Sequence, residues 1–116
     1  MEARRFEVTS EITGERYTVE FRWLQTAISL RGSDTVDVKF LVNDGAKVVA
    51  VPHGPLEQAC RDTGVPLTDP LCRRIAERHI AEALRSDEDS AQEILTLTPE
   101  RVGALVHAEA PRRRRE

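Results

Sequence analysis

The hydrophobic pattern of this chain changes its period near the middle of the sequence. Up to Pro52, apolar residues recur at every second position, as they do along a strand with one buried face. From Gly54 onward they recur every three or four positions, as they do along an amphipathic helix. A chain with strands first and helices second is typical of an α+β fold, in which the helices cover one face of an antiparallel sheet.

The strand half begins with two hydrophobic runs that predict a hairpin. Residues 6–12 form the first run, and Thr13-Gly14-Glu15 supplies a turn in which the glycine can adopt a positive φ. The second run begins at Arg16. Its alternation predicts that one set of side chains faces inward, namely Tyr17, Val19, Phe21 and Trp23.

The rest of the strand half holds further runs. Residues 26–31 either continue the second strand or form one of their own, and a turn follows them. The next inward set is Val36, Val38, Phe40 and Val42. Asn43-Asp44-Gly45 predicts a tight hairpin turn, after which residues 47–51 return as a short strand. Short connections between consecutive strands predict an antiparallel β-meander of four or five strands.

The helical half predicts one long amphipathic helix packed on one face of the sheet, with shorter flanking helices. The first short helix opens at Gly54-Pro55, runs to about Thr63 and ends at Gly64. Asp69 is the predicted N-cap of the long helix. Eight of its residues share one face and are expected to pack on the sheet: Leu71, Cys72, Ile75, Ala76, His79, Ile80, Ala83 and Leu84.

One segment after the long helix fits two structures equally well. Residues 90–97 match a capping box followed by a helix, but Ile94, Leu95 and Leu97 also fit an extended strand. The pattern leaves these alternatives open. A short final helix is expected after Thr98, which is a good N-cap and is followed by proline.

The chain ends in a concentrated positive charge. Residues 111–116 carry a net charge of +3, with arginines at four consecutive positions, Arg112, Arg113, Arg114 and Arg115. Since the whole chain has a net charge of −3, residues 1–110 carry −6. We expect residues 1–110 to form a single α+β domain and the basic tail to be disordered.

Two cysteines and two histidines are symmetrically spaced, at His53, Cys60, Cys72 and His79. On a helix, a spacing of seven residues separates two side chains by about 10 Å along the axis, too far for one metal ion. Cys72 lies in a first helical turn, which favours a thiolate, but His79 is two turns away and cannot serve as its base. We therefore expect buried thiols and a core-facing imidazole at position 79. No metal, cofactor or catalytic residue is predicted.

Composition excludes several classes of protein. With 40% hydrophobic and 32% charged residues, the chain is expected to fold rather than stay disordered. Its longest purely apolar run has four residues, at positions 48–51, against the ~20 that a membrane span needs. Its charged opening shows no secretory signal. We expect a cytoplasmic protein with reduced thiols and no membrane association.

Three functional hypotheses remain. The leading one is a non-enzymatic binding or regulatory module that self-associates or binds a protein partner, using a sheet edge or the apolar face of the last helix. The second is a weakly nucleic-acid-associated protein, using the arginine tail and the helix face with Arg73, Arg74 and Arg78. The third is a small enzyme with a pocket near His53 and Asp69, although no catalytic constellation is visible.

Overall fold

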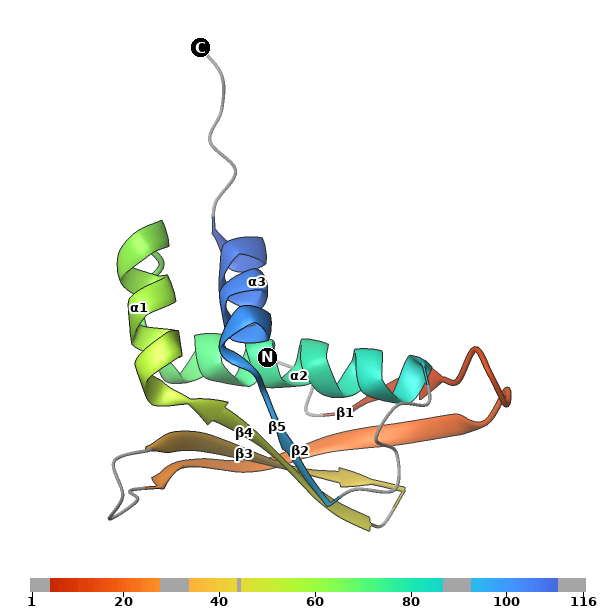
Figure 1. Ribbon diagram of the computed structural model, residues 1–116. Helices are drawn as coiled ribbons and strands as arrows, with labels where there is room; N and C mark the ends of the chain where they lie inside the picture. Colours follow the sequence, from red (N-terminus) through yellow and green to blue (C-terminus); the bar gives the residue numbers. More distant parts are fainter. Residues whose placement is uncertain (1–4, 28–33, 44, 87–92, 111–116) are drawn as a thin grey trace.

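A computed structural model describes residues 5–27, 34–43, 45–86 and 93–110, and shows one sheet with three helices on one side of it (Figure 1). The strands are β1 (Arg5–Thr9), β2 (Arg16–Ala27), β3 (Thr35–Val42), β4 (Gly45–Pro52) and β5 (Ile94–Thr96). The helices are α1 (His53–Thr63), α2 (Asp69–Arg85) and α3 (Pro99–Glu109). The strand order in the sheet is β1-β2-β3-β4-β5. The predicted α+β class, with a long helix and flanking helices, is confirmed.

The fifth strand makes the sheet mixed. β1 to β4 form the predicted antiparallel meander, but β5 pairs in parallel with residues 48–50 of β4. Two helices separate β4 from β5 in the chain, and such a long crossover allows a strand to return in the same direction. Of the two structures open for residues 90–97, the strand is adopted at Ile94–Thr96. Residues 90–92 lie outside the described residues.

A β-bulge interrupts the alternation of β2. Between Phe21 and Trp23, β2 advances by two residues while its partner β3 advances by one. Arg22 is therefore an extra residue, which reverses the faces of the residues that follow it. The prediction that Trp23 faces inward is wrong: Leu24 packs against the core instead, and Trp23 is 39% exposed on the opposite face. β2 is one strand as far as Ala27, and residues 28–33 lie outside the described residues.

The core lies between the sheet and the helices. The predicted inward set of β3 is buried, and the Phe21 and Phe40 rings meet edge to face with centroids 6.1 Å apart. Seven of the eight residues predicted on the inner face of α2 are buried. The exception is His79, which is only half-buried, so the prediction of a core-facing imidazole is wrong.

The helix ends follow their capping residues. α1 ends at Gly64, which adopts a φ of 78°, as the sequence predicts. The N-cap of α2 is Thr68 rather than Asp69, because the Leu71 N–H donates to the Thr68 hydroxyl over 3.2 Å. Asp69 is instead the first helical residue, where its carboxylate interacts favourably with the helix dipole. The predicted cap of α3 at Thr98 is confirmed.

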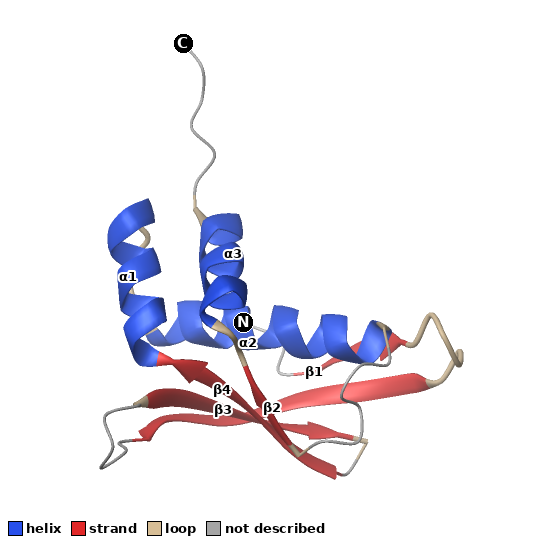
Figure 2. Cartoon of the chain, viewed as in Figure 1, coloured by secondary structure: helices blue, strands red, loops and turns tan. Residues whose placement is uncertain are grey.

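The helices form two groups above the sheet. α2 runs across the sheet, whereas α1 and α3 rise from it beside each other (Figure 2). In the part of the chain that the structure describes, no helix has the length and apolar character needed to cross a membrane. All three helices lie on one side, so none of the described helices covers the opposite side of the sheet (Figure 1).

Candidate functional site

The candidate site is the outer face of the sheet, which is the side of β2 to β5 that points away from the helices. Directly paired residues on neighbouring strands point to the same side, so the strand register defines this face. Three neighbouring rows of side chains cross its centre. They consist of Glu20, Leu41 and Ala46; of Trp23, Lys39, Val48 and Ile94; and of Gln25, Asp37, Ala50 and Thr96.

The middle row contains the most exposed apolar side chains of the face. Trp23 is 39% exposed on β2, and Ile94 is 61% exposed on β5. Lys39 and Val48 lie between them and are half-buried. The Lys39 ammonium lies 5.6 Å from the centroid of the Trp23 ring, at the distance of a cation–π contact. This row therefore presents an apolar stripe on β2, β4 and β5, in which the aliphatic stem of Lys39 on β3 lies between Trp23 and Val48.

Charges on the outer side of the sheet are mixed. Counting β1, the register places three basic and three acidic side chains there, Arg5, Arg16 and Lys39 against Glu7, Glu20 and Asp37, and the bulge residue Arg22 adds a fourth basic side chain beside Glu20. Glu20 forms ion pairs of 3.4 Å with both Arg5 and Arg22, and Asp37 accepts a 2.8 Å hydrogen bond from Thr35. A face with interspersed charges and a net charge of only +1 repels a second copy of itself weakly, and it attracts a polyanion weakly.

The arginines of α2, which the nucleic-acid hypothesis invokes, are paired with carboxylates. Arg73 contacts Glu77 at 2.9 Å and stacks over the Phe21 ring, 4.4 Å from its centroid. Arg74 and Arg78 both contact Glu109 of α3, at 2.7 and 3.0 Å. These contacts join α2 to the sheet and to α3. Because each cation already has an anion beside it, this face is a weak phosphate-binding surface.

The two cysteines are buried free thiols. Burial raises the pKa of Cys60. Burial also raises the pKa of Cys72 from 9.0 to about 11, and repulsion from Asp69 and Cys60 adds to this effect. The thiol form therefore dominates at neutral pH, which is the opposite of what a nucleophile requires. Within the described ranges, no group of three or more His, Cys, Asp or Glu residues is arranged to hold a metal ion.

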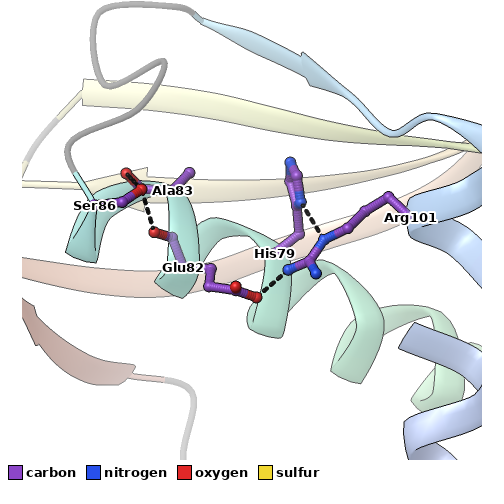
Figure 3. A network of polar contacts seen from close by, with 5 residues as sticks. All are labelled: His79, Glu82, Ala83, Ser86 and Arg101. Carbon is purple, nitrogen blue, oxygen red and sulfur yellow. Dashed lines mark hydrogen bonds and ion pairs between the residues drawn. The ribbon is translucent and has the colours of Figure 1, made fainter. Parts of the chain in front are cut away.

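His79 belongs to a polar network that links α2 to α3 (Figure 3). Its Nδ1 accepts a 3.3 Å hydrogen bond from Nε of Arg101, and the same guanidinium forms an ion pair with Glu82. The hydrogen bond from Arg101 lowers the pKa of Glu82. This network explains how a half-buried imidazole is accommodated at the edge of the apolar face of α2, since it has a polar partner on the neighbouring helix.

The two residues of the enzyme hypothesis, His53 and Asp69, do not share the cavity that Asp69 lines. Asp69 lines a shallow cavity of about 330 Å³, whose other lining residues are Phe21, Leu24, Pro70 and Arg73. His53 is the first residue of α1 and is not among them. The predicted nucleic-acid-binding residues Arg112, Arg113, Arg114 and Arg115 lie outside the described residues.

The sequence analysis did not predict that Trp23 and Ile94 lie on the outer face. Trp23 was expected inside, and Ile94 belonged to the segment whose structure was left open. One signal for the bulge is present, since Trp23 and Leu24 are adjacent apolar residues in an otherwise alternating run. The position of Ile94 beside Val48 has no local signal, because it depends on a parallel pairing between distant segments.

A comparison with known protein families, curated proteins and solved structures found no match to this chain. Its function therefore has to be inferred from the geometry of the site.

Proposed function

We propose that the protein is a non-enzymatic cytoplasmic binding module that associates with itself through the outer face of its sheet. The observation that carries this proposal is the stripe from Trp23 to Ile94, on a face that no described helix covers. Water-exposed apolar stripes of this kind are typical of interaction surfaces. Burial of the stripe supplies the driving force, at about 25 cal/mol per Å² of apolar surface removed from water.

The dimensions of the face predict a modest affinity. β3 and β4 have eight residues each, so they extend for about 26 Å at ~3.3 Å per residue. Four strands at ~4.8 Å spacing, with their side chains, add a width of about 19 Å. The face therefore has an area of about 500 Å², and two copies bury about 1,000 Å² in total, at the low end of specific interfaces. Such a dimer dissociates on dilution.

The experiment that tests the proposal is sedimentation equilibrium across a concentration series, with Ile94→Glu as the disrupting variant. We expect the wild type to dimerise and Ile94→Glu to weaken dimerisation by about tenfold or more, since a carboxylate is then desolvated at the interface. The matched control is Ile12→Glu. Ile12 is 71% exposed in the turn between β1 and β2, away from the outer face, so its substitution should leave dimerisation unchanged.

Two results would contradict the proposed self-association. A wild-type chain that stays monomeric up to about 1 mM, where even weak specific association is detectable, would overturn the proposal. Nucleic acid that copurifies at low salt and is released at high salt would support the arginine tail instead. Absorbance at 260 and 280 nm on the same samples distinguishes these results.

A further inference from the structure

We infer that the second copy docks by a twofold rotation about an axis parallel to the strands, running between β3 and β4. This inference rests on the proposed function, because it specifies the geometry of the same self-association. Its consequence is that Trp23 of one copy packs against Ile94 of the second copy. Each dimer contains this contact twice.

The order of residues in the middle row supports this axis. Across β2, β3, β4 and β5 the row reads Trp23, Lys39, Val48 and Ile94. The rotation reverses the row in the second copy, so β2 opposes β5 and β3 opposes β4. The two most exposed apolar side chains of the row then cover each other, and Lys39 opposes Val48. The Lys39 stem is apolar and its charge already lies over the Trp23 ring, so it packs on Val48 while its end reaches solvent.

The flanking rows fit the same axis by size. Leu41 opposes Ala46 of the second copy, and Asp37 opposes Ala50. In both pairs a larger side chain meets a smaller one, which allows two faces to interdigitate at about 10 Å between sheets. The alanines of β4 thus provide room for the larger residues of β3.

Two other axes on the face place like charges together. An axis that runs along β3, or one that crosses the strands at the middle row, brings Lys39 against Lys39 of the second copy. Repulsion of two desolvated ammonium groups disfavours both arrangements. Moving the axis to the gap between β3 and β4 removes this clash and retains an isologous contact, which is the commonest symmetry of soluble dimers.

The test uses two oppositely charged variants, Trp23→Glu and Ile94→Arg. Each variant alone places a charge against an apolar side chain at both copies of the contact, so we expect self-association to weaken by about 100-fold. In a 1:1 mixture, one contact pairs the new carboxylate with the new guanidinium, and the other contact keeps its original residues. We expect the mixture to recover affinity to within about tenfold of the wild type. Sedimentation equilibrium with one variant fluorescently labelled measures the mixed dimer.

Controls separate this geometry from general charge attraction. Trp23→Glu mixed with Trp23→Arg combines the same two charges on the outer face, but the inferred axis places each of them against Ile94 of the other copy, so recovery is not expected. Recovery in that mixture would overturn the inferred axis. Circular dichroism and urea unfolding confirm that the variants fold, as their exposed positions predict.

The two proposals fail in different ways. If both single variants dissociate and their mixture does not recover, the axis is wrong and self-association through the outer face still stands. If the wild type is monomeric, the proposed function itself is wrong. If Trp23→Glu and Ile94→Arg self-associate as well as the wild type, the contact between these residues is excluded.

Discussion

The two faces of the sheet come from the same strands but differ in almost every physical property. The inner face of β3 carries Val36, Val38, Phe40 and Val42, all buried under the helices. The outer face carries Asp37, Lys39 and Leu41 at the intervening positions, all half-buried. Adjacent residues thus contribute to two different surfaces.

The fold constrains the residues of the two faces to different degrees. The inner face of β3 is uniformly apolar, because any polar group buried there would lose water without a partner. The outer face mixes apolar, charged and small side chains, which the fold itself does not require. The proposed self-association accounts for its particular order, in which Trp23 and Ile94 stand at opposite ends of one row.

The largest effect should come from truncating the inner face. Phe40→Ala removes a fully buried ring in contact with Phe21, and we expect a loss of about 3–5 kcal/mol in the free energy of unfolding. Leu41→Ala, one residue along on the outer face, should cost about 1 kcal/mol or less. Urea unfolding of both variants, in the Ile94→Glu background to exclude association, measures the contrast. Equal losses in the free energy of unfolding would show that the outer face contributes as much to stability as the inner face.

The bulge is a local feature of β2, so its removal should leave the two faces as they are. Deletion of Arg22 joins Phe21 directly to Trp23, and strict alternation then keeps Trp23 on the outer face opposite Lys39. We expect the tryptophan emission spectrum to stay unchanged and the free energy of unfolding to change by about 1 kcal/mol or less. A shift of the emission to shorter wavelength would mean that the deletion turns Trp23 toward the core.

The helix α2, which packs on the inner face, is capped at its N-terminus by Thr68. Thr68→Ala removes the side-chain cap and should lower the free energy of unfolding by about 1 kcal/mol. Asp69→Ala removes only a favourable charge in the first turn and should cost less, about 0.3–1 kcal/mol. Thermal unfolding of the pair tests this ranking, and a larger effect at Asp69 would assign the cap there.

The smallest effect is expected in the network that joins α2 to α3. Glu82→Gln removes the ion pair with Arg101 and should cost about 0.2–0.5 kcal/mol, since the Glu82 side chain is 58% exposed and solvent screens the charges. Arg101 lowers the pKa of Glu82 in the folded state, so this stabilisation is present above the ordinary carboxyl pKa of 4.5. It is lost as the pH falls below that value. The wild type and Glu82→Gln should therefore converge in stability in acid, which urea unfolding at pH 7 and pH 3 checks.

Much of the fold was predictable because its signals are local. The Gly64 stop, the Thr98 cap and the Asn43 turn each depend on residues within a few positions of one another. The cap at Thr68 was missed by one residue, since threonine and aspartate are both good caps and the sequence does not show which hydroxyl or carboxylate reaches the Leu71 N–H. The position of His79 was missed because its partner, Arg101, lies on another helix.

The sequence by itself determined the fold class, the inner face of β3 and the apolar side of α2, because hydrophobic periodicity reports directly on which side chains leave water. Only the tertiary structure decided the bulge at Arg22, the parallel pairing of β5 and thus the row from Trp23 to Ile94. These features depend on backbone hydrogen bonds between segments far apart in the chain. Their energies appear only when the whole sheet is assembled, so no local pattern encodes them.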